Sequence, residues 1–126
     1  MGISDFNPTP VMQLRAIKPA EKSRLRVRAN ILNCTNCQLS NFQPDSARPV
    51  PWSGPRDPMF VAVGEAPGPE ESVAGRPFVG KSGKLLRAMM GSAGIDADDV
   101  MFVNAVSCFP NDDGKLRSPS LAELTA

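Results

Sequence analysis

Five glycines, three prolines and three glutamates lie between Gly64 and Leu86, directly behind the apolar run of residues 59–63. This composition predicts a loop that faces a ligand, because open α/β sheets bind ligands beyond the carboxyl ends of their strands. Glu65 comes just after the strand, so we expect its carboxylate to face a pocket. Phe78 is the one aromatic residue of the loop, and it is interpreted either as a plug that packs the loop down or as a stacking platform.

The cysteines form a second candidate site. Cys34 and Cys37 make a C-x-x-C pair, and Cys108 is the third cysteine of the chain. Such a pair in a reducing compartment indicates metal or redox chemistry more often than a disulfide framework. A zinc site built from the three thiolates is one alternative. Cys108 by itself is more typical of a small buried apolar residue.

Residues 75–82 satisfy the phosphate-binding pattern G-x-x-x-x-G-K-S/T letter for letter. A P-loop needs its first glycine directly after the strand, whereas eleven residues separate Val63 from Gly75. Pro77 also removes one of the amides that would bind phosphate. The context therefore argues against a nucleotide-binding P-loop, which stays open as an alternative in which Lys81 would contact Mg-ATP.

The elements that must position these residues are predicted to form one βαβ unit. Residues 59–63 are expected to form a strand buried on both faces, and residues 100–106 a second buried strand with Asn104 near its carboxyl end. Residues 81–90 predict the crossover helix. Residues 20–33 predict another helix that ends at Cys34, and the proline-rich residues 40–58 predict a loop. Four side chains of the crossover helix are expected to face the sheet: Leu85, Leu86, Met89 and Met90.

Length and charge set the broad class. The chain has 126 residues, enough for one domain, and a net charge of +1. We expect residues 1–19 to be a mobile arm and residues 20–126 to form the domain. The absence of a membrane-length apolar run or a secretory leader predicts a cytoplasmic protein without a membrane partner. The first 30 residues are basic, which indicates either a solvated helix face or phosphate attraction; the basic residues are Arg15, Lys18, Lys22, Arg24, Arg26 and Arg28.

Three blocks of the sequence together resemble a known family. The first block is similar to the first motif of the iron–sulfur, family 4 uracil-DNA glycosylases. It consists of GEAPG from residue 64, G-R-P-F-V-G from residue 75 and the S-G and L-L that follow. The segment from Asn104 to Pro110 resembles that family's N-x-V-x-C-x-P, and Cys34 to Cys37 its amino-terminal C-x-x-C. The resemblance covers roughly residues 25–126. It implies an α/β fold, a three-layer α/β/α parallel sheet of the uracil-DNA glycosylase type.

The resemblance also implies roles for single residues. Phe78 would stack on a flipped-out uracil, with Ala66 beside it, and Asn104 would bind the amide edge of the base, because a carboxamide both donates and accepts. Glu65 and Glu71 lie at the family's acidic positions, where one of them positions water or shapes the pocket. Asn111 or Asp113 would match an asparagine that follows the third cysteine. The candidate contacts to DNA phosphate are Gly68, Lys81, Ser82 and Lys84.

A 4Fe-4S cluster is the implied cofactor, bound by Cys34, Cys37 and Cys108. The family's fourth cysteine follows in a pattern like P-x-x-x-E-x-x-x-C, which Pro119 and Glu123 match up to the final position. The family's later H-P-S-type loop carries a histidine, and this sequence has none. We therefore expect an apparently truncated fold with uncovered sheet edges, which a second chain would complete.

Three function classes follow from these observations. The first is a uracil-DNA glycosylase that hydrolyses the N-glycosidic bond of deoxyuridine in DNA. The second is a catalytically inactive relative that binds DNA or protein, and the third is the P-loop nucleotide binder.

Overall fold

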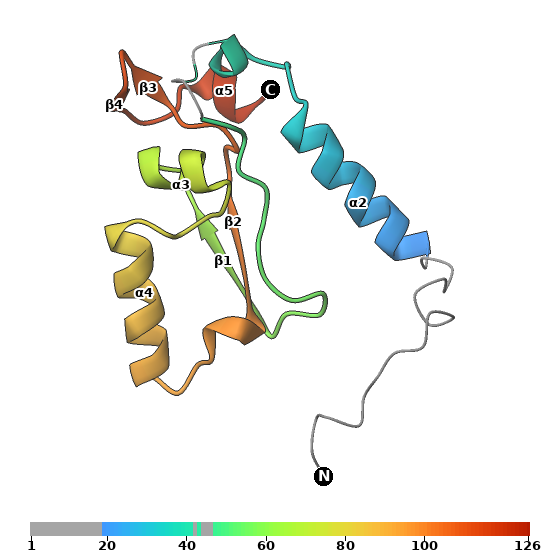
Figure 1. The fold of residues 1–126 in the computed structure, drawn as a ribbon, viewed down its shortest axis with the longest axis vertical. Coiled ribbons are helices and arrows are strands. Elements are labelled where there is room, and N and C mark those ends of the chain that lie inside the picture. Colours follow the sequence, from blue (N-terminus) through green and yellow to red (C-terminus); the bar gives the residue numbers. More distant parts are fainter. Residues whose placement is uncertain (1–18, 42, 44–46) are drawn as a thin grey trace.

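The computed structural model describes residues 19–41, 43 and 47–126 of the chain (Figure 1). The predicted arm therefore lies outside the described residues, except for Pro19, which is the first residue of a helix. The elements, in chain order, are α2 (Pro19–Leu32), η2 (Gln38–Asn41), β1 (Phe60–Gly64), α3 (Pro69–Ala74), α4 (Lys81–Ser92), η3 (Ala97–Asp99), β2 (Val100–Asn104), β3 (Asn111–Asp112), β4 (Lys115–Leu116) and α5 (Leu121–Leu124).

The centre of the fold is the parallel pair of β1 and β2. Phe60 pairs with Val100 at one end and Gly64 with Asn104 at the other. The two strands therefore end at the same edge of the sheet, which places the residues after Gly64 beside Asn104. The predicted α/β architecture with a parallel sheet and a helical crossover is confirmed.

Helix α3 lies in the segment that the sequence analysis treated as a loop. Pro69 stands at its start, where the missing N–H costs no helical hydrogen bond. Gly75 ends the helix with a φ of 65°, in the left-handed region that glycine adopts without a steric cost. One helical turn and a half therefore stands between β1 and the phosphate-binding pattern.

The buried character predicted for β1 is wrong. Val61 is 54% exposed and Val63 is 68% exposed, while Val100 and Phe102 of the neighbouring strand are at most 1% exposed. The reason is topological: in the described part of the chain β1 pairs with one strand only. The expectation of an uncovered sheet edge and uncovered apolar side chains is confirmed.

Helix α4 forms as predicted, but two of its four sheet-facing assignments are wrong. Leu85 is 62% exposed and Met89 is 60% exposed. Leu86 and Met90 are half-buried. A buried contact is instead made by Gly83, which lies directly against the backbone of Phe78.

The loop of residues 47–58 covers the far edge of β2. Ser53 and Phe102 exchange two backbone hydrogen bonds, with N···O distances of 2.9 and 2.7 Å. The Val50 amide donates to the Ser107 carbonyl at 2.7 Å. The loop therefore shields β2 on the edge away from β1, which explains why β2 is buried and β1 is not.

Helix α2 is held mainly by polar contacts and by its end at the cysteines. The guanidinium carbons of Arg24 and Arg28 lie 5.8 and 5.9 Å from the ring centroid of Trp52. Arg28 also donates to the Trp52 carbonyl at 2.9 Å. Leu25 and Val27 of this helix are 53% and 47% exposed. No helix among the described residues has the length and apolar character that crossing a bilayer requires.

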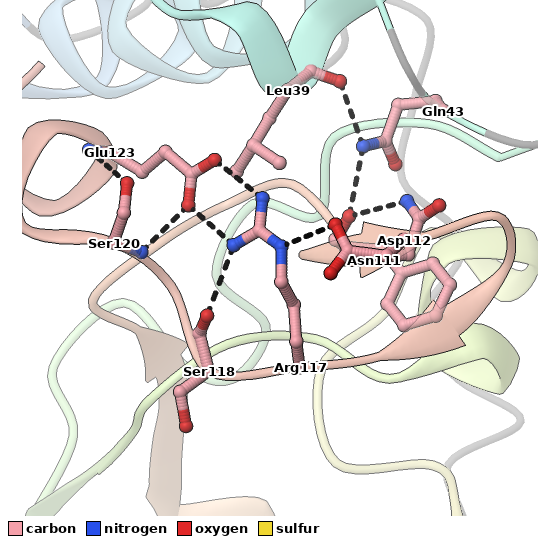
Figure 2. A network of polar contacts seen from close by, with 9 residues as sticks. Leu39, Gln43, Asn111, Asp112, Arg117, Ser118, Ser120 and Glu123 are labelled. Atoms are coloured by element: carbon pink, nitrogen blue, oxygen red, sulfur yellow. Dashed lines mark hydrogen bonds and ion pairs between the residues drawn. The ribbon is translucent and has the colours of Figure 1, made fainter.

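A short hairpin and helix α5 form the last part of the fold. Asp113 and Gly114 connect β3 to β4 with φ values of 50° and 80°, the two positive angles that a type I′ turn requires. Figure 2 shows how Arg117, just after β4, fastens the hairpin to α5: its guanidinium binds both carboxylate oxygens of Glu123 at 2.8 and 2.9 Å. The hairpin is therefore tied to the body of the domain at its base.

Replacing Gly83 by alanine is expected to destabilise the fold, because the new Cβ would overlap the backbone of Phe78. The expected loss in free energy of unfolding is about 1–3 kcal/mol, the usual cost of overpacking. Gly91→Ala in the same helix is the matched control, since a Cβ there meets nothing within 4 Å. The control should gain about 0.5–1 kcal/mol from helix propensity. Urea denaturation measures both, and equal effects at the two glycines would contradict the close approach.

The ion pair at α5 predicts a pH dependence of stability. Hydrogen bonds from Arg117 hold the pKa of the Glu123 carboxyl at about 2, below its ordinary 4.5. Because the folded pKa is the lower one, the stabilisation is complete above pH 4.5 and is lost as the pH falls towards 2. At pH 7 the Glu123→Gln variant should therefore unfold at a lower urea concentration than the parent. The difference between the two urea midpoints should become smaller as the pH falls from 4.5 to 2.

The control for this titration is Glu70→Gln, which changes an exposed carboxylate. Its urea midpoint should follow that of the parent at every pH. A Glu123→Gln deficit that stays constant from pH 7 to pH 2 would show that the ion pair does not carry the effect.

Candidate functional site

The main cavity, of about 730 Å³, opens where β1 and β2 end. One wall comes from the loop behind β1 and the start of α4, and the other from the end of the β3–β4 hairpin. We call this cavity the strand-end cleft. Its lining residues are Gly64, Glu65, Ala66, Gly68, Pro69, Glu70, Glu71, Phe78, Gly80, Lys81, Ser82, Asn104, Leu116, Arg117 and Ser118.

Phe78 and Asn104 meet at Gly64 in the floor of the cleft. A Cβ at Gly64 would lie 2.8 Å from the Phe78 ring and against Oδ1 of Asn104. Only glycine leaves room for both side chains at this point, the end of β1. The two residues that the resemblance assigned to the base are therefore adjacent, although 26 positions separate them in the chain.

The position of Phe78 is fixed from several directions. Its φ is 57°, an uncommon value for a residue with a side chain. Its ring lies 5.3 Å from that of Phe102, and its carbonyl accepts a hydrogen bond from Arg87 at 3.2 Å. The guanidinium of Arg87 in turn lies 4.0 Å from the Phe102 ring centroid. Phe78 is half-buried and lines the cleft, so it both packs against the core and presents part of its ring to a ligand.

The carboxamide of Asn104 is available to a ligand. Asn104 is the last residue of β2, and the backbone after it continues the pairing, since the Ala105 amide donates to the Gly64 carbonyl at 2.9 Å. No hydrogen bond joins the Asn104 side chain to any residue that the structure describes. The amide NH₂ and the carbonyl oxygen both remain to bind a molecule in the cleft.

The two acidic candidates occupy different environments. Glu71 is 8% exposed, and its oxygens accept hydrogen bonds from the amides of Gly68 (3.2 Å), Val79 (3.1 Å) and Gly80 (2.8 Å). Its carboxylate therefore joins the start of α3 to the start of α4. Glu65 is exposed and follows β1 directly. Glu65 is the carboxylate of this pair that a ligand or water reaches without displacing a loop contact.

The same contacts bear on the phosphate-binding pattern. Val79 and Gly80 supply amides that a P-loop would direct at phosphate, and both donate to Glu71 instead. Gly75 caps α3 rather than following a strand. The geometry of residues 75–82 is thus a helix-to-helix connection closed around a carboxylate.

The four candidate phosphate contacts are distributed unevenly. Lys81 and Ser82 are exposed and line the cleft at the first turn of α4. Gly68 also lines the cleft, but its amide is engaged by Glu71. Lys84 is exposed and lies outside the cleft lining. Two of the four residues, Lys81 and Ser82, therefore lie at the cleft with exposed polar side chains.

Sequence reasoning missed the hairpin wall of the cleft and the support given by Arg87. Leu116, Arg117 and Ser118 line the cleft opposite the loop behind β1. The Asp113-Gly114 dipeptide is a strong hairpin signal that would have placed them. Asn111, considered as a family position, is 7% exposed and donates to the Phe109 carbonyl at 3.0 Å, while Asp113 stands at the exposed turn.

The three cysteines line a second cavity of about 310 Å³, together with residues of α2 and α5 and the terminal Ala126. Cys108 is 7% exposed, and Cys37 packs against its cluster. Burial raises the pKa of the Cys108 thiol to about 11, and the neighbouring Cys37 and Cys34 act in the same direction. Within residues 19–41, 43 and 47–126, no three acidic, histidine or cysteine side chains converge as the ligands of a single metal ion do.

Comparison with known proteins adds independent information on this chain. The sequence profile of the Uracil DNA glycosylase superfamily matches residues 51–126, which include the strand-end cleft. The Type-4 uracil-DNA glycosylase of Sulfurisphaera tokodaii is 36% identical over 102 residues, which are 80% of this chain and 44% of that protein. Those of Pyrobaculum aerophilum and Thermotoga maritima are 38% and 37% identical, over 76% and 79% of this chain.

These relatives are longer proteins. The matched segments amount to 46% of the Pyrobaculum protein and 49% of the Thermotoga protein, so this chain spans about half the length of the relatives it matches. The family profile nevertheless covers more than half of the chain, and the matched region carries β1, β2, the cleft and Cys108. The chain therefore belongs to the Uracil DNA glycosylase superfamily.

Proposed function

We propose that this chain acts as a uracil-DNA glycosylase, which hydrolyses the bond between uracil and deoxyribose in DNA during base excision repair. One observation carries the proposal: Phe78 and the carboxamide of Asn104, which has no hydrogen-bond partner among the described residues, meet in one cleft at the end of the parallel strands. An aromatic ring and a carboxamide together match a flat base whose edge offers both a donor and an acceptor. The relatives that share this region are named Type-4 uracil-DNA glycosylases.

Recognition of the base requires that the nucleotide leave the helical stack. In the proposed complex the uracil is turned out of the DNA and stacks on Phe78, beside Ala66, while Asn104 binds the amide edge of the ring. Gly64 supports this arrangement because it keeps the space between the two side chains free. A cleft shaped by backbone in this way holds a base with little side-chain rearrangement.

The chemistry places a negative charge on the departing uracil and a positive charge on the sugar. When the N-glycosidic bond breaks, the electron pair leaves with the base, and water then adds to the sugar carbon. The NH₂ of Asn104 is a fixed donor towards the base oxygen on which charge develops. Glu65, whose side chain is exposed, is the residue proposed to orient the water.

Glu71 has a different part in this proposal. Its three amide contacts hold the loop that carries Phe78. A carboxylate with both oxygens engaged is poorly placed to activate water, so Glu71 acts by positioning Phe78. The proposed division of the two acidic residues is thus a water-orienting Glu65 and a loop-holding Glu71.

DNA binding is proposed to use the rim of the cleft. Lys81 and Ser82 lie at the first turn of α4, where backbone amides, a hydroxyl and an ammonium group favour a phosphate oxygen. Lys84 lies one turn further along α4 and would contact the same backbone from outside the cleft. Gly68, at the start of α3, would bring the protein backbone close to the DNA strand.

The cysteine cavity is proposed to hold an iron–sulfur cluster. Cys34, Cys37 and Cys108 line one cavity, and several cysteine thiolates around one cavity are the kind of ligand that iron–sulfur clusters take. Ala126 and Glu123 line the same cavity. When bound, the cluster would join α2 to the segment after β2, a structural role that supports the cleft.

We propose that the uncovered apolar surface is covered by further polypeptide of the glycosylase fold. A second chain that completes the fold is one way to supply it. Val61, Val63 and Met89 are each at least 54% exposed, on the open side of β1 and on α4. The segments that match this chain amount to 44% and 49% of two of these relatives, so the relatives contain further polypeptide. A parallel strand beside β1 would bury this surface and satisfy the open edge.

Uracil release from a single-stranded oligonucleotide with one deoxyuridine tests the proposed activity. The anaerobically purified parent should release uracil, and Asn104→Ala should lower the rate by about 100-fold, the usual effect of losing one preorganised donor. Asn41→Ala, an exposed asparagine outside both cavities, is the matched control and should keep the parent rate. Equal rates for parent and Asn104→Ala would assign the release to a contaminant, and no release by folded parent would favour the inactive relative.

Metal analysis of the same preparation tests the cysteine site. The anaerobic parent should contain iron and acid-labile sulfide rather than zinc, and Cys108→Ser should lose both. Thr35→Ala, between the first two cysteines but outside the cavity lining, should retain them. Stoichiometric zinc without sulfide would contradict the cluster and favour a mononuclear site.

A further inference from the structure

Helix α2 and the loop of residues 47–58 enclose a second charged site, on the edge of the sheet away from β1. Arg24 and Arg28 stand one helical turn apart on α2, and their guanidinium carbons lie 5.8 and 5.9 Å from the ring centroid of Trp52. A cavity of about 250 Å³ opens beside them and shares no lining residue with the strand-end cleft. We call this cavity the arginine groove, after Arg24, Arg28 and Arg56 in its lining.

The arginine groove carries more positive than negative charge. Among its described lining residues Glu21 is the one carboxylate, and it pairs with Arg56 at 3.1 Å. Neither Arg24 nor Arg28 forms an ion pair with a carboxylate in the part of the chain that the structure describes. Two like charges held near one ring repel each other, and a bound anion would remove that cost.

The two unpaired guanidinium groups are fixed before any ligand binds. Arg24 donates to the Arg56 carbonyl at 3.0 Å, and Arg28 donates to the Trp52 carbonyl at 2.9 Å. Each bond uses one of the five N–H donors of an arginine, so several donors on each side chain remain for a ligand. Planar guanidinium groups with spare donors are well suited to bind phosphate through two parallel hydrogen bonds.

The sheet holds Trp52, the support of both arginines, in place. The next residue, Ser53, exchanges two backbone hydrogen bonds with Phe102 of β2. Gly54 approaches β2 so closely that a Cβ there would lie 2.8 Å from the Cα of Met101. The indole is therefore a fixed platform, and the arginines of α2 are positioned on it by cation–π and hydrogen-bond contacts.

We propose that the arginine groove binds a backbone phosphate of DNA outside the strand-end cleft. The choice of DNA rests on the proposed glycosylase function. The donors of the groove are long side chains at an open surface, which suits a phosphate of an extended polymer better than a small anion that must be enclosed. Such a contact positions the DNA and carries no information on its sequence.

The salt dependence of DNA affinity tests the proposal. A duplex of several helical turns that contains thymine in place of uracil measures binding without cleavage. The double variant Arg24→Gln/Arg28→Gln should reduce the slope of log affinity against log salt concentration by about 1–2, because each phosphate contact contributes about 0.9. An unchanged slope would overturn the proposal.

The matched control is Lys22→Gln/Arg26→Gln. Both residues are exposed on α2 outside the groove lining, have the same spacing as the two arginines and remove the same charge. The control should change the slope by less than half as much as Arg24→Gln/Arg28→Gln. Equal changes with the two double variants would overturn the groove, since the loss of net charge would then explain both.

Removing the two arginines also removes contacts between α2 and the loop, so a third variant separates charge from packing. Arg24→Lys/Arg28→Lys keeps both charges but loses the planar guanidinium groups. It should keep the salt slope of the parent and bind more tightly than the glutamine double variant. A slope as low as that of the glutamine variant would show that packing of α2, and not a phosphate contact, causes the loss.

Trp52 gives a readout at the groove itself, because it is the one tryptophan of the chain. The thymine duplex should change its fluorescence saturably in the parent and in Lys22→Gln/Arg26→Gln, but not in Arg24→Gln/Arg28→Gln. Poly-glutamate is the probe for an acidic polypeptide, and inorganic phosphate is the probe for a free anion. An equal response to either probe, at the same concentration of charged groups, would overturn the assignment to DNA.

These measurements also separate failure of the groove from failure of the proposed activity. Neither the salt slope nor the fluorescence requires uracil or cleavage of the glycosidic bond. If the parent releases no uracil from a single strand, the proposed activity fails, and binding of the thymine duplex still decides the groove. A parent that releases uracil but shows no fluorescence response to DNA would keep the activity and overturn the groove.

Discussion

The buried carboxylate of Glu71 is the contact on which the cleft depends. Its two oxygens accept hydrogen bonds from three backbone amides, one at the start of α3 and two just before α4. The loop between these helices carries Phe78 at a positive φ, a conformation that persists only where the surroundings fix it. Without the carboxylate, those three amides would lose their hydrogen-bond acceptor, and the loop would lose the contacts that hold it closed. The site is thus built from backbone contacts before any ligand is present.

Two close approaches complete the same construction. Gly83 brings the first turn of α4 against the backbone of Phe78, and Gly64 lets the Phe78 ring and the Asn104 carboxamide share the end of β1. Arg87 then holds the Phe78 carbonyl and lies over Phe102. The Phe78 ring and the Asn104 carboxamide are therefore held at fixed positions by rigid elements, which is what the proposed binding of a flat base requires.

Local sequence signals predicted part of this structure. The strands predicted over residues 59–63 and 100–106 and the helix predicted over residues 81–90 all formed, although the second strand ends at Asn104, two residues earlier than predicted. The exposure of β1 was not predictable, since a continuous apolar strand looks the same whether or not a neighbour covers it. Helix α3 was also missed, and the hydrogen bonds of Glu71 were not predictable, because two of its three amide donors lie eight and nine residues further along the chain.

The phosphate-binding pattern shows that the spacing of a motif does not by itself predict which ligand a loop binds. A loop with the letters of a P-loop would direct amides at an anion, and here the amides of Val79 and Gly80 do meet one, the carboxylate of Glu71. A nucleotide phosphate at that position would meet a negative charge where it needs donors. The amides of this loop therefore already bind an anion of the same chain. The groups that remain in the cleft include Phe78 and Asn104, which suit the proposed neutral base. The residues that match a nucleotide-binding motif thus form part of the strand-end cleft.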